Sequence, residues 1–581
     1  MAQPDPIAQP EQPVAPEVTA AGPPAPELTL PALAATKESS LVRTSGGIAI
    51  ASLVSRVTGF ARQLALVAVL GLGVINDSYT VANTLPLIVY ELLLGGVLTS
   101  VMIPLLVRAQ VDDPDGGEAY TQRLLTAASV MLVLATGVAM VAAPLLTRLY
   151  LGGEGQTNAN PALATAFAYL LLPEIIFFGL GALFGAILNS RAVFGPFAWA
   201  PVVNNLVMLV VLAIYALTPG EISLDPVRMG DPKLLVLGLG TTAGIVIQAA
   251  VLLPALRRVG FRWRLRWGWD RRLTEAGGLA LWVIGYVLIG QVGYIVTTRV
   301  AAAADPGSVS TYATAWLLLQ VPYGVFGVSL LTALMPRMSR AAALGDDQEV
   351  VADLSRGTRL SVVALIPVSV LLTLFGTALG VALFAHGRTG EADAARLGLT
   401  VAVSAFGLLP FAMVMLQLRV FYAMKDGRTP TVIQVIIVAV KVPLLLACPL
   451  LLPPEQVVLG LAAANSASFV IGAGIGQWWL RNRLGSVRTR AALRTIGLTT
   501  LASLLAGMIA FAVVVFMQLS VLRELDPVLR AWVILAVGAL LGGALTVVLL
   551  RVLRVAEIEP MWRWLTRRRR QRSPSRATRR R

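Results

Sequence analysis

Residues 495–517 read TIGLTTLASLLAGMIAFAVVVFM, an apolar stretch that contains no charged side chain. About 20 residues of α-helix cross the ~30 Å hydrocarbon core of a bilayer, so this stretch is long enough to span a membrane. Comparable stretches recur from about Ser45 to Leu553 in a chain of 581 residues that is 56% hydrophobic and only 13% charged. The sequence therefore predicts an all-α polytopic membrane protein rather than a soluble domain with one anchor.

The apolar stretches predict fourteen membrane-spanning helices. Their connections carry 21 Lys and Arg on the side shared with the N-terminus, against 8 on the opposite side. Because Lys and Arg concentrate in cytoplasmic connections, this contrast predicts that both termini are cytoplasmic. The predicted spans are residues 44–70, 78–107, 122–147, 162–188, 197–217, 234–256, 273–298, 311–336, 360–385, 397–423, 431–451, 456–480, 495–517 and 531–553.

The chain also repeats itself at an offset of about 232 residues. Ser78-Tyr79 and the Gly, Pro and Arg that follow it recur after Thr311-Tyr312, and the turn at 191–196 recurs at 425–430. An even number of spans in each repeat makes the repeats parallel. The repeat predicts two six-helix lobes related by a pseudo-two-fold axis along the membrane normal, plus two extra C-terminal helices, which is a transporter architecture.

The two ends of the chain differ from its apolar body. The start is rich in Pro and Ala and lacks the apolar run of a signal peptide, so we expect a disordered tail. Twelve arginines between Arg551 and Arg581 form a basic tail. Each basic residue beside a membrane gains ~1 kcal/mol from anionic phospholipids, a partner that we favour over nucleic acid. The predicted parts are a tail at 1–42, a first lobe at 43–256, a basic linker at 257–272, a second lobe at 273–484, a lipid-tail groove at 485–553 and a basic tail at 554–581.

Cysteine and histidine are nearly absent, with Cys448 and His386 the sole examples. One cysteine forms no internal disulfide, and no His/Cys cluster is present to bind a metal or a cofactor. The sequence also contains no GxxxxGK[ST] loop for nucleotide phosphates. We therefore expect no metal, no cofactor and no enzyme activity.

A few ionisable residues fall inside the predicted spans, where an arginine costs ~2.5–3.5 kcal/mol even on a lenient scale. Arg56 and Arg62 share the first span and lie ~120° apart on an ideal helix. Guanidinium groups match phosphate oxygens bidentately, so both arginines in one cleft suit an anionic cargo and a diphosphate in particular. The alternative is that they pair with carboxylates and lock helices together. The other intramembrane ionisable residues are Asp77, Glu91, Glu174, Arg419 and Lys441.

These other residues receive different interpretations. Glu174 follows Pro173 and favours a structural role, and Lys441 has no assigned role. Arg299, near the end of the seventh span, either adds positive charge to the cleft or reaches the interface.

At these residues the sequence resembles the MurJ (MviN) lipid II flippases of the MOP transporter superfamily, and its arginine-rich style resembles actinobacterial members. The likeness covers about residues 43–550. The matching stretches are 55–62, 76–86, 185–189, 322–336 with Gly324-Val325-Phe326-Gly327-Val328, and Phe421-Tyr422-Ala423 to Asp426 with Thr429-Pro430.

The resemblance implies a two-lobed carrier with a central cationic cavity that takes lipid II, an undecaprenyl diphosphate bearing a disaccharide and a peptide. Arg56, Arg62 and Asp77 fall on functionally important family positions. Two basic family positions fall here on Tyr90, beside Glu91, and near Leu317.

This chain therefore has a less basic cavity than the resemblance implies, and we expect Arg299 or Arg419 to compensate. A sodium site of some relatives needs acidic groups in spans seven and eleven and is not carried over, because the interiors of these spans offer Gln291 and Gln434 but no carboxylate. The predicted substrate-binding residues are Arg56, Arg62, Asp77, Glu91, Arg299 and Arg419.

We predict a lipid II flippase of the bacterial cytoplasmic membrane that moves its cargo from the inner to the outer leaflet by alternating access. One alternative is a flippase for another lipid-linked oligosaccharide. The other is a non-transporting scaffold that recruits cell-wall synthesis or division proteins, which are candidate partners of the flippase as well.

Overall fold

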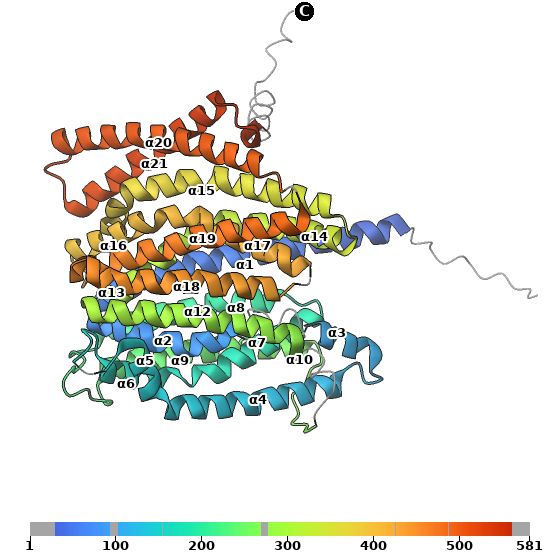
Figure 1. The fold of residues 1–581 in the computed structure, drawn as a ribbon. Helices are drawn as coiled ribbons and strands as arrows, with labels where there is room; N and C mark the ends of the chain where they lie inside the picture. The colour runs from blue at the N-terminus through green and yellow to red at the C-terminus, as the bar shows by residue number, and fades with distance from the viewer. Residues whose placement is uncertain are drawn as a thin grey trace, which may run out of the picture. The chain divides into compact units, whose positions relative to one another are not determined.

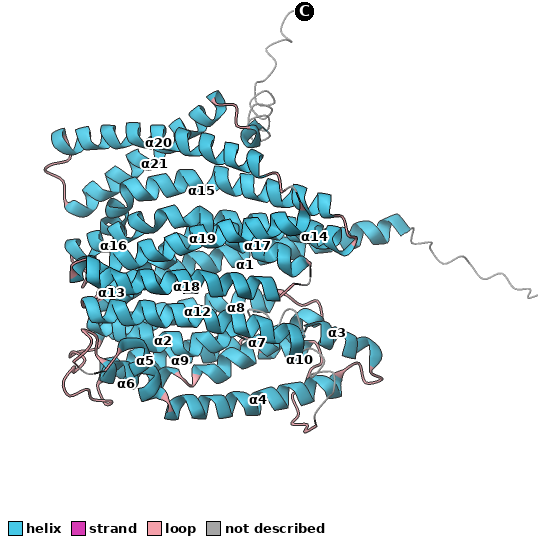
Figure 2. Cartoon of the chain, viewed as in Figure 1, coloured by secondary structure: helices cyan, strands magenta, loops and turns pink. Residues whose placement is uncertain are grey.

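The computed structural model describes residues 30–92, 103–153, 155–268, 277–424, 426–485 and 487–559. Helices dominate these ranges, and no strand occurs within them (Figures 1 and 2). The helices are α1 Leu30–Leu70, α2 Val74–Leu92, α3 Ile103–Asp112, α4 Glu118–Val141, α5 Ala143–Leu151, α6 Pro161–Leu171, α7 Glu174–Ser190, α8 Gly195–Leu217, α9 Pro232–Ala250, α10 Leu253–Arg258, α12 Gly277–Ala304, α13 Ser308–Pro322, the π-helix η2 Tyr323–Gly327, α14 Val328–Ala343, α15 Asp347–Phe384, α16 Glu391–Ser404, η3 Ala405–Gly407, α17 Leu408–Ala423, α18 Arg428–Leu451, η4 Pro454–Gln456, α19 Val457–Leu484, α20 Thr489–Ser520, α21 Pro527–Val552 and η5 Ala556–Ile558.

The predicted helical membrane fold is confirmed. Among the described residues, 12 helices are long and apolar enough to cross a membrane, or 13 when the bent pair α6 and α7 counts as one span. Each of them overlaps one of the predicted spans. The remaining predicted span, 78–107, includes residues 93–102, which lie outside the described ranges. The count of fourteen therefore stays a prediction.

The bend between α6 and α7 measures 42° and falls at Pro173. A proline inside a helix removes one hydrogen bond and clashes with the preceding turn, which breaks the span. Glu174 is the first residue of α7, is buried, and accepts a hydrogen bond of 3.3 Å from the Thr242 hydroxyl. A carboxylate is stabilised at the positive end of a helix dipole, which supports the structural role predicted for Glu174.

Contacts divide the chain into a unit of residues 1–50 and a unit of residues 51–581. The domain boundaries drawn from the sequence stay predictions. Helix α1 begins at Leu30, inside the range 1–42 for which we expected disorder. Most of the basic tail at 554–581 lies outside the described residues.

The helices of the second unit run side by side (Figure 1). In the first half of the chain, α2 packs on α6 and α7, and α8 packs on α9. In the second half, α12 packs on α18, α18 on α19, and α15 on α16. Helices α20 and α21 pack on each other and on α15. The last two spans are thus attached to the second half through α15.

Small residues bring α15 and α16 close together. A Cβ at Gly380 would lie 2.1 Å from the carbonyl oxygen of Ala394, and a Cβ at Gly398 would lie 2.2 Å from that of Gly376. Such positions admit glycine alone, because a methyl group would overlap backbone atoms. Close backbone approach is a general way for membrane helices to gain packing energy.

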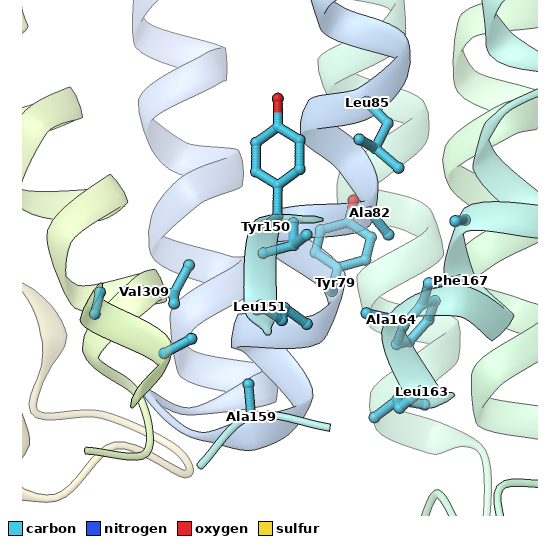
Figure 3. Close-up of a cluster of buried hydrophobic side chains, with 14 of the residues drawn as sticks. Tyr79, Ala82, Leu85, Tyr150, Leu151, Ala159, Leu163, Ala164, Phe167 and Val309 are labelled. Carbon is cyan, nitrogen blue, oxygen red and sulfur yellow. The ribbon is translucent and has the colours of Figure 1, made fainter. Parts of the chain in front are cut away.

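A buried hydrophobic cluster joins the two halves of the chain (Figure 3). Tyr79 of α2 meets Phe167 of α6 edge to face, with ring centroids 5.7 Å apart. The Tyr79 hydroxyl lies 3.1 Å from that of Thr241 in α9, so its polar end has a partner. Val309 of α13 belongs to the same cluster. The first half therefore shares a core with the start of α13.

Candidate functional site

A cavity of about 900 Å³ lies between the two halves of the chain. Its walls come from α1 and α2 of the first half, and from α12, α13, η2, α18 and α19 of the second. Three of the six predicted substrate-binding residues line it: Arg56, Arg62 and Glu91. A chamber at the junction of two repeats is where a transporter of this architecture binds its cargo.

Two neighbours hold the part of α1 that carries the arginines. The Asn205 side chain of α8 donates hydrogen bonds of 3.1 Å to the Ser55 carbonyl and to the Thr58 hydroxyl. On another side, the Gln63 amide donates to the Thr314 hydroxyl of α13 at 3.1 Å. Because buried amides seek such partners, these bonds fix the rotation of α1. Arg56 and Arg62 are left facing the chamber.

The Arg56 guanidinium lies against the backbone of Gly324 in the π-helix η2, on the far wall of the cavity. A Cβ placed on Gly324 would lie 2.0 Å from Nη1 of Arg56. Single π-helical turns are rare and often occur at functional sites. The side chain of Arg56 thus extends from the first half of the chain to the second.

Neither arginine is sealed in a salt link within the part of the chain that the structure describes. No Asp or Glu oxygen of the described residues lies within 4.0 Å of the Arg56 or Arg62 guanidinium. The alternative in which both arginines lock helices through carboxylates therefore has no support in these ranges. Both groups are available to an anion in the chamber.

Asp77 does not line the cavity. It is buried, and its carboxylate accepts hydrogen bonds of 2.8 Å from the backbone N–H groups of Gly307 and Ser310. Gly307 is the N-cap of α13, so the carboxylate of one half satisfies the free N–H groups at the start of a helix of the other. Asp77 thus joins the two halves of the chain at the N-terminus of α13.

Arg299 and Arg419 are exposed and also lie outside the cavity lining. Glu91 lines the cavity and accepts a hydrogen bond of 3.5 Å from the Gln291 amide. The Tyr150 hydroxyl approaches the Gln291 carbonyl oxygen at 3.5 Å. The structure therefore brings Arg56, Arg62 and Glu91 together. The substrate contacts of Asp77, Arg299 and Arg419 stay predictions.

The sequence assigned no substrate-binding role to several polar and aromatic residues of the chamber. Lys441 and Gln434 reach it from α18, Asn465 and Phe469 from α19, and Trp316 from α13. The signal for Lys441 was its position inside an apolar span. The aromatic residues carry no such signal, because aromatic side chains are common in any helix interior.

Hydrogen bonds between the halves gather at one end of the cavity. There the Asn158 amide group donates to the Ala303 carbonyl at 3.0 Å, and the backbone N–H of Arg388 donates to the Ala68 carbonyl at 2.8 Å. The Arg388 guanidinium also donates to the Glu221 carboxylate at 2.9 Å. Apart from Ala68, which lies near the end of the first predicted span, these residues belong to connections that the charge count predicts to be outside. The contacts at this end are called the outer closure below.

No group of three or more His, Cys, Asp or Glu residues in the described ranges is placed to hold a metal ion. The lining of the chamber offers guanidinium, ammonium, carboxylate and amide groups, which bind by charge and by hydrogen bonds. A helical membrane protein with a cationic chamber between two similar halves, closed at one end, belongs to the class of membrane carriers.

The sequence model of the lipid II flippase MurJ family matches residues 66–529, so the chain belongs to this family. A probable lipid II flippase MurJ of Rhizobium meliloti is 27% identical over 432 residues, which cover 73% of this chain and 78% of that protein. The lipid II flippase MurJ of Burkholderia cenocepacia is 27% identical over 394 residues, which cover 66% of this chain and 73% of that protein.

Solved structures show the same fold. A lipid II flippase MurJ in an inward closed conformation superposes with a TM-score of 0.69 at 18% identity, covering 87% of this chain and 99% of that one. An inward-facing multidrug resistance transporter of the MATE family, in the MOP superfamily, gives a TM-score of 0.59 at 13% identity, covering 76% and 99%. The MOP-type carrier fold predicted from the sequence is confirmed.

Gly324 offers a test of the Arg56 position. Replacing Gly324 by Ala places a methyl group 2.0 Å from Nη1 of Arg56, and the flexible arginine must swing away. We expect Gly324→Ala to fold with wild-type thermal stability and to lose roughly tenfold in the rate of cargo transfer, the loss of one well-placed charged contact. The measurement is transfer of a labelled polyprenyl diphosphate in proteoliposomes.

Gly474 of α19 provides the matched control, because a Cβ there meets no atom within 4 Å. Gly474→Ala is expected to transfer at the wild-type rate. Equal rates for Gly324→Ala and Gly474→Ala would show that the Arg56 position seen here has no role in transfer.

Proposed function

We propose that this protein moves lipid II from the inner to the outer leaflet of the bacterial cytoplasmic membrane by alternating access. The observation that carries the proposal is the chamber between the halves, which Arg56 and Arg62 line with guanidinium groups that pair with no carboxylate of the described residues. Membership of the lipid II flippase family names the cargo class. The protein acts as a carrier and not as an enzyme.

Arg56 and Arg62 bind the diphosphate of the cargo. A planar guanidinium donates two parallel hydrogen bonds to phosphate oxygens, which gives direction as well as strength. The apolar walls of the chamber strengthen the attraction, because a low-dielectric surrounding screens charge poorly. Both arginines lie on α1, so a single helix positions both contacts.

The polyprenyl tail stays in the lipid while the headgroup enters the chamber. Helices α20 and α21 pack on α15 and expose large apolar side chains such as Leu505, Phe516 and Leu540. Burying apolar surface against a hydrocarbon tail costs no desolvation of polar groups. We assign the tail to the surface of these two helices.

Alternating access requires the outer closure to open and the opposite end to shut. Both termini are cytoplasmic in this proposal, so the outer closure faces the outer leaflet. Asp77 contributes by closing the chamber across the halves. The membrane potential drives the cycle when net charge moves, since one charge through 100 mV is worth ~2.3 kcal/mol.

The proposed partners follow from charge. The twelve arginines from Arg551 onward suit anionic phospholipids of the inner leaflet. Cell-wall synthesis or division proteins remain candidate partners, and nucleic acid is not among those we propose.

A different lipid-linked oligosaccharide as cargo would use the same two chamber arginines, Arg56 and Arg62, because its diphosphate is the same. The family assignment favours lipid II.

The first prediction concerns the arginines. Arg56→Ala and Arg62→Ala each remove a guanidinium from the chamber, so each is expected to fail to support growth when the native protein is depleted. Lipid II then accumulates in the inner leaflet, which a headgroup-accessibility assay measures. Arg523→Ala, in the exposed connection between α20 and α21, is the control and supports growth. Growth with both chamber variants would refute the proposal.

The second prediction concerns the outer closure. An ideal Cβ on Gly71 lies 3.6 Å from the Cβ of Arg388, within the range of a disulfide, although Gly71 has a positive φ of 76° and a cysteine there strains the backbone. Gly71→Cys with Arg388→Cys, in a Cys448→Ser background, is expected to lock this end when oxidised and to stop transfer. Reduction is expected to restore transfer, and each single cysteine variant is the control. Undiminished transfer by the cross-linked protein would exclude opening at this end.

The third prediction separates a carrier from a scaffold that acts through its tails. Glu557 pairs with Arg359 at 2.8 Å and Ile558 is buried, so truncation must begin after residue 559. We expect the protein without residues 1–29 and 560–581 to support growth at near wild-type expression. Loss of growth together with normal transfer in proteoliposomes would favour the scaffold.

A further inference from the structure

Lys441 lines the chamber from the second half of the chain. It belongs to α18, well inside the helix, and its side chain is half-buried. Its stem runs over Gly293 of α12, where a Cβ would lie 3.7 Å from Cδ. Two helical turns earlier on α18, Gln434 lies beside Gly290, where a Cβ would lie 3.2 Å from Nε2. Two glycines of α12 thus leave room for two polar side chains of α18.

The ammonium group of Lys441 has no counter-ion of its own. Among the described residues, no Asp or Glu oxygen lies within 4.0 Å of its Nζ. A lysine inside a membrane span is costly unless water or a partner solvates it. Water that enters the chamber would solvate the ammonium group, and an anionic cargo would supply the partner.

The charged groups of the chamber are unbalanced. Among the described residues, its lining contains Arg56, Arg62 and Lys441 against a single carboxylate, Glu91, which leaves a formal net charge of +2. A diphosphate that joins a lipid to a sugar carries two negative charges, whereas a lipid monophosphate diester carries one. The chamber therefore balances the charge of a diphosphate when Lys441 takes part.

We propose that Lys441 is a substrate-binding residue that contacts the diphosphate from the second half and makes the site selective for diphosphate over monophosphate lipids. This inference rests on the proposed function and adds a residue to its site. The arginines belong to the first half, so a diphosphate held by Lys441 as well bridges the two halves. An ammonium is a point charge on a flexible stem, so it follows a phosphate as the halves move.

The test measures binding of two probes to the full-length protein in lipid nanodiscs. The probes are a polyprenyl diphosphate and a polyprenyl monophosphate that carry the same tail and the same terminal sugar, so that they bear two and one negative charges, and titration gives a Kd for each. For Lys441→Gln we expect the Kd for the diphosphate to rise roughly tenfold and the Kd for the monophosphate to rise about twofold or less, since one charge-assisted contact is lost. Lys441→Arg keeps the charge and is expected to stay within about threefold of wild type for both probes.

The control is Arg523→Gln, which removes one positive charge outside the chamber and is expected to change neither Kd. Thermal unfolding of every variant accompanies the titration. If Lys441→Gln is unstable, the ratio of its two Kd values in the folded fraction still tests the selectivity, because this ratio does not depend on the amount of folded protein. Lys441→Arg then shows whether a positive charge at this position is enough for binding.

The outcomes separate the inference from the proposed function. An unchanged diphosphate-to-monophosphate ratio in Lys441→Gln, with the ratio reduced in Arg56→Ala, overturns the role of Lys441 and leaves the flippase proposal standing. Equal weakening for both probes in Lys441→Gln overturns the selectivity. A wild-type protein that binds the two probes equally well also overturns the selectivity, and one that binds neither probe contradicts the proposed function itself.

Discussion

A positive charge placed among apolar helices must meet a carboxylate, water or a ligand, because hydrocarbon cannot solvate it. In this protein that constraint applies to Arg56, Arg62 and Lys441, none of which has a carboxylate partner among the residues described. They share one chamber between the two halves, where water or an anionic cargo would solvate them. A sealed core at this place would leave three charges without compensation.

The arrangement of the two halves around the chamber depends on contacts between residues that do not line it. Asp77 joins the first half to the start of α13, and the backbone of Arg388 joins the second half to Ala68. Both kinds of contact use main-chain groups at helix ends, which are free to bond because the helix itself leaves them unpaired. Such contacts break and form without disturbing the interior of any helix. They are suited to an end that opens and closes once per cycle.

The two halves contribute unlike chemistry to the chamber. The first half provides two guanidinium groups on a helix that is held in place, since Asn205 and Gln63 form hydrogen bonds that fix the helix carrying the arginines. The second half provides a flexible ammonium, amides and the aromatic pair Trp316 and Phe469, whose rings stack with centroids 5.8 Å apart. A cargo held between them contacts two bodies that move relative to each other in the proposed cycle. Binding and motion are therefore coupled through the same atoms.

Much of the fold and part of the site could be predicted from the sequence alone. The spans, the helical class and the internal repeat depend on local hydropathy and spacing, which a chain carries whatever its packing. Arg56 and Arg62 stood out for the same reason, because a charge inside an apolar stretch is visible without coordinates. Membership of the carrier class followed from these features together.

The tertiary structure determined the direction in which each of these side chains points. Asp77 and Glu91 look alike in the sequence, yet one binds the N-terminus of α13 and the other lines the chamber. Arg419 and Lys441 are both intramembrane cations, and only Lys441 reaches the chamber. The reason is physical: the rotation of a helix about its axis is set by packing against neighbours far away in the chain. Here the glycines of α12 and the amide of Asn205 set that rotation, and no local pattern encodes it.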